Sequence, residues 1–214
     1  MKDHILHLPK FFASCDCKEV IDFFDKMKDL QREGSAGVDP KTLQSFVDLS
    51  VKKCSQISLD LNNRHEYPNI CYSIVRTLDL GLDIYRKEYP FLNNLPQWDI
   101  YPYFNIQKYD TGDAYYQMHC ENNGQTILHT SRIAAWMIYL NDVTDDGETV
   151  FPSQNKKFKP CAGDLLLWPA YWTHPHKGIP SPTQTKYIAT GWINFNEIDE
   201  KIERTFYSEY QSMN

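Results

Sequence analysis

In the N-terminal half of the chain, apolar residues recur at the spacing of an amphipathic helix. The clearest run lies between Asn69 and Tyr89, and Pro90 follows directly after it, where a helix readily ends. We therefore predict a long helix whose apolar face packs against a sheet. The apolar positions of this run are Ile70, Ile74, Leu78, Leu82 and Tyr85.

Shorter elements precede this helix. Residues 4–12 show the alternation of a strand, and Asp16 with Glu19 three positions later predicts a helix N-cap at the start of an amphipathic helix. Residues 42–49 allow a second short helix, and residues 57–61 alternate like another strand. The first half of the chain is thus predicted to be mainly helical, with a few strands.

From Phe104 onward the pattern changes to short strands separated by turns. Residues 132–140 are apolar at both odd and even positions, so this strand is predicted to lie between two layers. Many short strands after a helical half predict a mainly β, α+β fold built on a barrel or a sandwich. The other predicted elements are strands at residues 104–109, 148–152, 165–168 and 187–195, and a closing helix at residues 198–210.

Length and composition fit one globular domain. The chain has 214 residues, of which 42% are hydrophobic and 14% aromatic, and this is enough to build a sizeable core. We expect a single domain over residues 1–214. Within it we expect a helical buttress with edge strands in residues 1–95, a β core in residues 96–196, and the closing helix in residues 197–214.

Charge and cysteine content restrict the partners and the compartment. The net charge of −6 and the isoelectric point near 5.6 give no electrostatic basis for binding nucleic acid or an anionic membrane. The six cysteines form no zinc-ribbon or disulfide pattern, and no apolar run has the length of a signal peptide core or a membrane span. We expect a cytoplasmic protein, and the sequence leaves its oligomeric state open.

Candidate chemistry is concentrated around His119 and Glu121. Side chains separated by one residue point to the same side of an extended strand, so this imidazole and carboxylate can share one metal ion. By itself His-x-Glu is a weak motif, and it is more often a structural or surface pair. Either His174 or His176 would complete a set of two histidines and one carboxylate, which is typical of non-haem Fe(II) oxygenases.

Several further motifs stand at fixed distances from these residues. They are Tyr109-x-x-Gly112, Tyr116-x-x-His119, Tyr139-Leu140-Asn141, Glu148-Thr149-Val150-Phe151-Pro152, Lys186 ten residues after His176, and Trp192 six residues after Lys186. Together they resemble the 2-oxoglutarate- and Fe(II)-dependent dioxygenases of the prolyl 4-hydroxylase type. The resemblance covers residues 104–195 approximately. It implies a double-stranded β-helix, or jelly roll, with flanking N-terminal helices.

The resemblance implies that His119, Glu121 and His176 are the Fe(II) ligands and the catalytic centre. In the family a basic residue follows the distal histidine by ten positions, and Lys186 takes that place only if the ligand is His176 rather than His174. The chain departs from the family at Glu121, where most members have Asp. A carboxylate is nevertheless an oxygen ligand that suits Fe(II).

The cosubstrate contacts are also implied by the resemblance. Lys186 would bind the far carboxylate of 2-oxoglutarate, and Thr190 shares its strand parity and points into the same space. The hydroxyls of Tyr109 and Tyr139 would donate hydrogen bonds to the cosubstrate. Ordinary core packing is an equal alternative for Tyr139 and a weaker one for Tyr109. Trp192 would shape the pocket.

The implied reaction hydroxylates an unactivated C–H bond, consumes O2 and 2-oxoglutarate, and releases succinate and CO2. A prolyl residue of a peptide or protein is the leading substrate, a small molecule such as a free amino acid is the other, and ascorbate is a further cofactor that the resemblance allows. Two other classes compete with this reading. A cupin-like metal enzyme without a keto acid is disfavoured by Lys186, and a non-catalytic jelly-roll binding module is favoured by Glu121.

Overall fold

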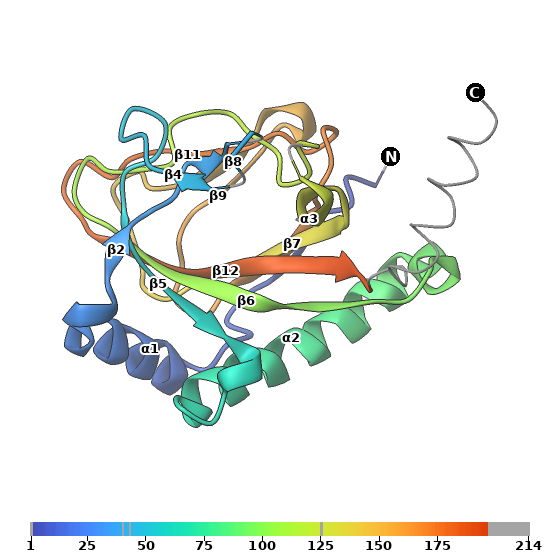
Figure 1. Cartoon of the computed structure of the whole chain (residues 1–214), viewed down its shortest axis with the longest axis horizontal. Coiled ribbons are helices and arrows are strands. Elements are labelled where there is room, and N and C mark those ends of the chain that lie inside the picture. Colours follow the sequence, from blue (N-terminus) through green and yellow to red (C-terminus); the bar gives the residue numbers. More distant parts are fainter. Residues whose placement is uncertain (1, 40, 43, 125, 197–214) are drawn as a thin grey trace.

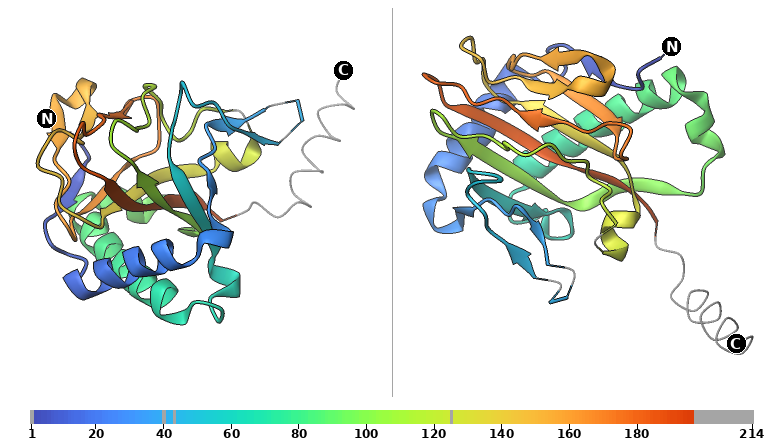
Figure 2. Two further views of the ribbon diagram at one scale, coloured as in Figure 1. Left: turned by 90° about the vertical axis from the view of Figure 1, so that its left-hand side faces the viewer. Right: turned by 90° about the horizontal axis from the view of Figure 1, so that it is seen from above.

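The computed structural model describes residues 2–39, 41–42, 44–124 and 126–196, and these residues form three layers (Figure 1). Two helices lie under a large antiparallel sheet, and a smaller sheet lies over the opposite face. The side view in Figure 2 shows both helices on the same side of the large sheet. The predicted mainly β fold with flanking N-terminal helices, a jelly roll, is confirmed.

The large sheet has seven strands, and every neighbouring pair is antiparallel. Most neighbouring strands are not consecutive in sequence, so long connections join them. In spatial order the strands are β1 (Leu6–Leu8), β10 (Leu165–Pro169), β7 (Arg132–Tyr139), β12 (Lys186–Phe195), β6 (Trp98–Tyr109), β5 (Ser55–Asp60) and β2 (Arg32–Glu33).

The second layer is smaller. Its strands, in spatial order, are β11 (Lys177–Gly178), β8 (Thr149–Phe151) and β9 (Lys156–Phe158). A separate two-stranded hairpin, β3 (Gly37–Val38) and β4 (Ser45–Phe46), projects from the body of the protein (Figure 2). The helix allowed for residues 42–49 is therefore wrong. The Asp39 carboxylate accepts the backbone N–H groups of Lys41 and Thr42, which turns the chain back into β4.

Two helices cover the lower face of the sheet, α1 (Ser14–Lys26) and α2 (Pro68–Glu88), and a short helix α3 (Ile127–Thr130) precedes β7. The long helix is confirmed, and all five of its predicted apolar positions are buried. The N-cap predicted at Asp16 is wrong, because α1 begins two residues earlier without a side-chain cap. The short 3-10 helices are Lys28–Leu30, Leu61–Asn63, Pro90–Asn94 and Pro152–Gln154.

Both faces of the large sheet carry an apolar cluster. All eight residues of β7 are buried, and alternate positions join different clusters. Trp136 and Ile138 pack with the helices, whereas Met137 and Tyr139 pack with Phe151 under the smaller sheet. The prediction of a strand between two layers is confirmed. The second cluster forms the floor of the site described below.

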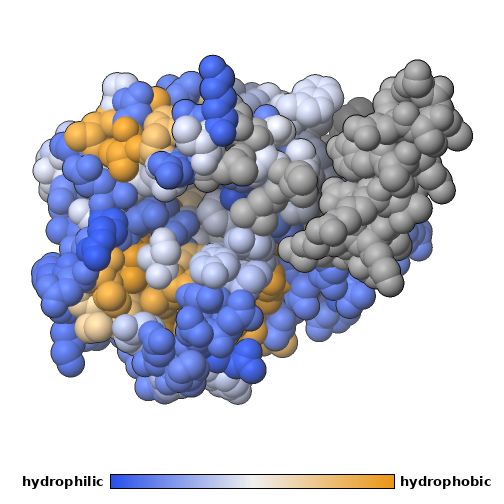
Figure 3. Space-filling model, in the orientation of Figure 1, coloured by the Kyte–Doolittle hydropathy of each residue, from blue (hydrophilic) through white to orange (hydrophobic). Residues whose placement is uncertain are grey.

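Among the described residues, no helix is both long enough and apolar enough to cross a membrane. The face shown in Figure 3 is mainly hydrophilic, with two separate apolar areas. All six cysteines are free thiols, as the sequence predicts. The closing helix predicted at residues 198–210 lies outside the described residues.

Candidate metal centre and adjoining cavity

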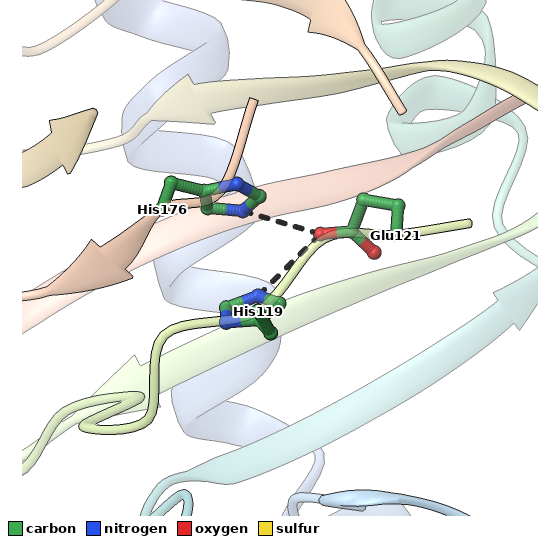
Figure 4. Close-up of side chains that lie close together, drawn as sticks. All are labelled: His119, Glu121 and His176. Carbon is green, nitrogen blue, oxygen red and sulfur yellow. Dashed lines mark ion pairs between the residues drawn. The ribbon is translucent and has the colours of Figure 1, made fainter. Parts of the chain in front are cut away.

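Three side chains converge on one point between the two sheets (Figure 4). The Glu121 Oε1 atom lies 3.6 Å from His119 Nε2 and 3.3 Å from His176 Nε2. One ligand atom from each residue lies within 4.8 Å of the other two. The structure thus brings together the three residues that the sequence singled out.

The backbone holds two of these residues in register. His119 and His176 form an isolated antiparallel bridge, in which each N–H donates to the carbonyl oxygen of the other residue at 3.0 and 2.9 Å. The His119 segment is therefore extended, as predicted, but it forms this single bridge and no regular strand. The bridge joins two parts of the chain that lie more than fifty residues apart in sequence.

His174 is buried but points away from the centre. Its Nε2 donates to the Asp3 carbonyl oxygen at 2.7 Å, and its Nδ1 accepts from the Thr173 hydroxyl at 2.9 Å. Both ring nitrogens are occupied by protein partners. The geometry therefore leaves His174 as an anchor for the N-terminal segment.

The two converging imidazoles are fixed in one tautomer. Nδ1 of His119 donates to the Gln117 carbonyl oxygen at 2.9 Å, and Nδ1 of His176 donates to the His174 carbonyl oxygen at 3.0 Å. Nε2 of each ring therefore faces Glu121 and is the atom that can bind a metal ion once it is deprotonated. Burial and the neighbouring His176 lower the pKa of His119, although Glu121 opposes this, and the lower pKa favours the neutral ring that a metal ion requires.

Aromatic rings hold the imidazoles in place. Tyr115 stacks on His119 with ring centroids 3.6 Å apart and an interplanar angle of 13°. Phe151 stacks on His176, and Trp168 meets the same ring edge-on, both at 5.1 Å between centroids. These apolar contacts restrict the rotation of both histidines and exclude water from the centre.

The carboxylate of Glu121 is held from outside by Trp192 and Arg132. Its Oε2 accepts a hydrogen bond from Trp192 Nε1 at 2.7 Å and lies 3.8 Å from Arg132 Nη1, while the guanidinium covers the indole at 3.8 Å. Burial alone would raise the pKa of Glu121, but its contacts with the two histidines outweigh burial and hold the pKa well below its usual range. One oxygen of an ionised carboxylate thus remains for a cation.

The donor set fits a divalent metal ion. Two ligands that bind one ion at about 2.1 Å and at right angles lie about 3 Å apart, which is close to both distances from Glu121 Oε1. Two neutral imidazoles and one carboxylate suit Fe(II) and leave other coordination positions open.

A cavity of about 240 Å³ adjoins the three residues. Its floor consists of alternate residues of β6 and β12, as expected for side chains that share one face of a sheet. Four positions of β12 point into it, namely Lys186, Ile188, Thr190 and Trp192. The small sheet and the β3–β4 hairpin contribute the opposite walls.

Lys186 places a buried ammonium group in this cavity. Its side chain is 5% exposed, its Nζ donates to the Gly147 carbonyl oxygen at 2.9 Å, and it lies 5.0 Å from the centre of the Tyr109 ring. No carboxylate of the described residues lies within 4.0 Å of it. Burial lowers the pKa of Lys186 to about 8, although the charge of Glu148 partly offsets this.

The remaining predicted cosubstrate residues differ in position. Tyr109 and Thr190 line the cavity, with the Tyr109 hydroxyl donating to Gln107 Oε1 at 2.8 Å. The hydroxyl of Tyr139 instead donates to the Phe158 carbonyl oxygen at 3.1 Å and lies 2.8 Å from Thr149 Oγ1, behind the cavity wall. Of the two readings of Tyr139, this geometry matches core packing.

Lys52, Tyr115 and Arg132 are among the lining residues that sequence reasoning missed. Arg132 carried a usable signal, because it is a charged residue at the head of a strand that is otherwise apolar. Lys52 lies beside Lys53 in a polar stretch and carried no such signal.

Comparisons with known proteins agree with this geometry. Residues 104–194 match the family model of the 2OG-Fe(II) oxygenase superfamily. A putative prolyl 4-hydroxylase of Acanthamoeba polyphaga mimivirus is 31% identical over 162 residues, which cover 70% of this chain and 61% of that protein. The chain therefore spans less than two thirds of this relative's length.

Solved structures share the fold. A viral collagen prolyl hydroxylase from Paramecium Bursaria Chlorella virus-1, in complex with 2OG, has a TM-score of 0.65 and 17% identity, with 90% of this chain and 97% of that chain covered. A prolyl hydroxylase from Trichoplax adhaerens, in complex with a peptide fragment of the hypoxia inducible factor oxygen degradation domain, has a TM-score of 0.63 and 18% identity, with 91% and 84% covered. The sequence matches thus make residues 104–194 similar to the 2OG-Fe(II) oxygenase superfamily and the chain similar to prolyl 4-hydroxylases, and the solved structures show that it shares their fold.

Proposed function

We propose that the protein is a 2-oxoglutarate- and Fe(II)-dependent dioxygenase that hydroxylates a prolyl residue of a peptide or protein. The observation that carries this proposal is the buried ammonium of Lys186, which has no acidic partner among the described residues and lies in the cavity that adjoins the His119, Glu121 and His176 set. A cationic group of this kind suits a dicarboxylic cosubstrate.

Each residue then has a defined task. His119, Glu121 and His176 hold Fe(II), Lys186 binds the far carboxylate of 2-oxoglutarate, and Thr190 and Tyr109 line the same pocket. When bound, the metal couples the reaction of 2-oxoglutarate, O2 and a C–H bond to the formation of succinate, CO2 and an alcohol. The aromatic residues around the histidines exclude water from the reacting groups.

The choice of a prolyl substrate rests on similarity. The relative from mimivirus is named a putative prolyl 4-hydroxylase, and the Trichoplax adhaerens enzyme holds a peptide. A free amino acid remains the second candidate substrate. The six free thiols support a reducing compartment, and we propose the cytoplasm.

Coupled turnover tests this function. The protein would be incubated with Fe(II), 2-oxoglutarate, O2 and ascorbate, and prolyl peptides and free amino acids would be screened for succinate release and for a product one oxygen atom heavier. We expect a peptide to stimulate succinate release and to be hydroxylated in equal amount. Metal binding without any succinate would contradict the proposal and favour a cupin-like enzyme without a keto acid. The absence of both metal binding and turnover would favour a non-catalytic module.

The affinity for 2-oxoglutarate is expected to fall as the pH rises above about 8. The free protein must keep Lys186 protonated to bind the carboxylate, and the pKa of Lys186 is lowered to about 8 by burial. The dissociation constant of 2-oxoglutarate should therefore increase with pH, by up to about tenfold for each pH unit above that value. Calorimetric titration without O2, with Mn(II) in place of Fe(II), measures it.

Lys186→Arg is the matched control, because a guanidinium stays protonated over this range. Its affinity is expected to be weaker but much less dependent on pH. The same pH dependence in both proteins would show that another group controls binding.

A further inference from the structure

A second buried lysine, Lys52, lies in the wall of the same cavity. It lies three residues before the start of β5, forms an isolated bridge with Tyr115, and is 6% exposed. Its Nζ donates to the Ser35 carbonyl oxygen at 3.2 Å and lies 5.4 Å from the centre of the Tyr115 ring. Both contacts are to groups without a formal charge.

No counter-ion explains the burial of this ammonium. No carboxylate of the described residues lies within 4.0 Å of its Nζ. The adjacent residue, Lys53, has a side chain that is 53% exposed and forms an ion pair with Asp113 at 2.9 Å. The available acid therefore pairs with the exposed lysine, and a buried cation without a partner is rare unless a ligand supplies the negative charge.

Lys52 and Lys186 occupy different walls. The Lys186 ammonium contacts Gly147 and Tyr109, whereas the Lys52 ammonium contacts Ser35 and Tyr115. Ser35 begins the stretch that leads into the β3–β4 hairpin, which projects from the body of the protein (Figure 2). Residues 35–38 line the cavity on that side. A keto acid that binds the metal has a single far carboxylate, and Lys186 already accounts for it.

The charge of the cavity supports the same conclusion. Its ionised lining residues are three cations, Lys52, Arg132 and Lys186, and one carboxylate, Glu121. A divalent metal and a doubly charged cosubstrate cancel each other. The cavity thus keeps a net positive charge when both are bound. Arg132 faces Glu121 and Lys186 faces the cosubstrate, so Lys52 is the lining cation whose charge is left without a partner.

We propose that Lys52 binds a carboxylate of the substrate, and that the enzyme acts on substrates with an acidic group beside the residue that is hydroxylated. This inference rests on the proposed hydroxylase function. The carboxylate has two sources, an acidic side chain next to a prolyl residue within a peptide, or the α-carboxylate of a C-terminal or free amino acid. Peptides that differ only in these groups distinguish the two sources.

The test compares the parent protein, Lys52→Met and the neighbouring control Lys53→Met. Each is assayed with prolyl peptides carrying Glu or Gln next to proline, and with C-terminal prolyl peptides in free and amidated form. The parent is expected to favour one acidic form at least tenfold in kcat/KM. Lys52→Met is expected to lose this preference and to keep the KM for 2-oxoglutarate and the metal affinity of the parent, whereas Lys53→Met keeps the preference.

Lys52→Arg keeps the charge and is expected to retain part of the preference, which a purely structural role of Lys52 would not predict. If Lys52→Met does not fold, Lys52→Gln takes its place in the comparison. Turnover by the parent without preference for an acidic form would overturn this inference and leave the hydroxylase function standing. A raised KM for 2-oxoglutarate in Lys52→Met would also overturn it, by making Lys52 a cosubstrate contact. A parent that turns over no 2-oxoglutarate would overturn both.

Discussion

His176→Ala is expected to abolish tight metal binding and all turnover, whereas His174→Ala is expected to keep both. The reason is the opposite orientation of two rings only two residues apart. Nε2 of His176 faces Glu121 at 3.3 Å, while both ring nitrogens of His174 are occupied by Asp3 and Thr173. Fluorescence or calorimetric titration of Fe(II) without O2, followed by a succinate assay, measures the difference.

Both variants should also lose some stability. His174→Ala removes a buried hydrogen bond to Asp3 that ties down the N-terminal segment, which costs about 1–3 kcal/mol of unfolding free energy. His176→Ala removes a comparable buried hydrogen bond, from Nδ1 to the His174 carbonyl oxygen, so metal binding and not stability separates the two variants. Loss of metal binding in His174→Ala, with wild-type binding in His176→Ala, would show that the assignment of the distal histidine is reversed.

Elements dominated by one local pattern could be predicted from the sequence. The helix α2 and the strand β7 have long apolar periodicities, and both lie where expected. The start of α1 was missed because its position is set by a tertiary contact. The Phe12 N–H donates to the Gly163 carbonyl oxygen at 2.9 Å, so the chain enters the helix directly after this anchor, before Asp16.

The strand β6 is longer than predicted for a related reason. Pro102 makes residues 98–103 look like a loop, but in the structure it lies at a register shift of the β6–β12 ladder, where residues 101–103 of β6 stand opposite Trp192 alone. A proline is tolerated where the ladder is irregular. No local pattern in β6 reveals such a shift, because it depends on the opposite strand.

The candidate site divides in the same way. His119, Glu121, His176 and Lys186 could be predicted because their spacing along the chain is informative. Their assignment as metal and cosubstrate residues stays a prediction until metal and 2-oxoglutarate binding are measured. Lys52 could not be found, because its importance arises from burial against residues 35–38, and nothing in the sequence distinguishes it from Lys53.

Glu121→Ala is expected to reduce Fe(II) affinity strongly and to remove nearly all turnover. The substitution removes the only carboxylate among the ionised lining groups of the cavity and leaves its three cations. Glu121→Asp keeps the charge but is one methylene shorter, so it cannot reach both the metal and the Trp192 indole. It should retain some activity. Metal titration without O2 and the rate of succinate release measure both variants.

Trp192→Phe tests whether the longer side chain of Glu121 works because its outer oxygen is held. The indole N–H donates to Glu121 Oε2 at 2.7 Å, and loss of such an outer hydrogen bond to a metal ligand typically costs about 10–100-fold in metal affinity or activity. If Trp192 acts through this oxygen, Trp192→Phe should have little further effect on metal affinity in the Glu121→Asp background, because the bond is already lost there. Equal effects in both backgrounds would limit Trp192 to shaping the pocket.

Should Glu121→Ala bind Fe(II) as tightly as the parent and release succinate at a similar rate, another group must fill the third position, and two histidines with one carboxylate would not describe this centre.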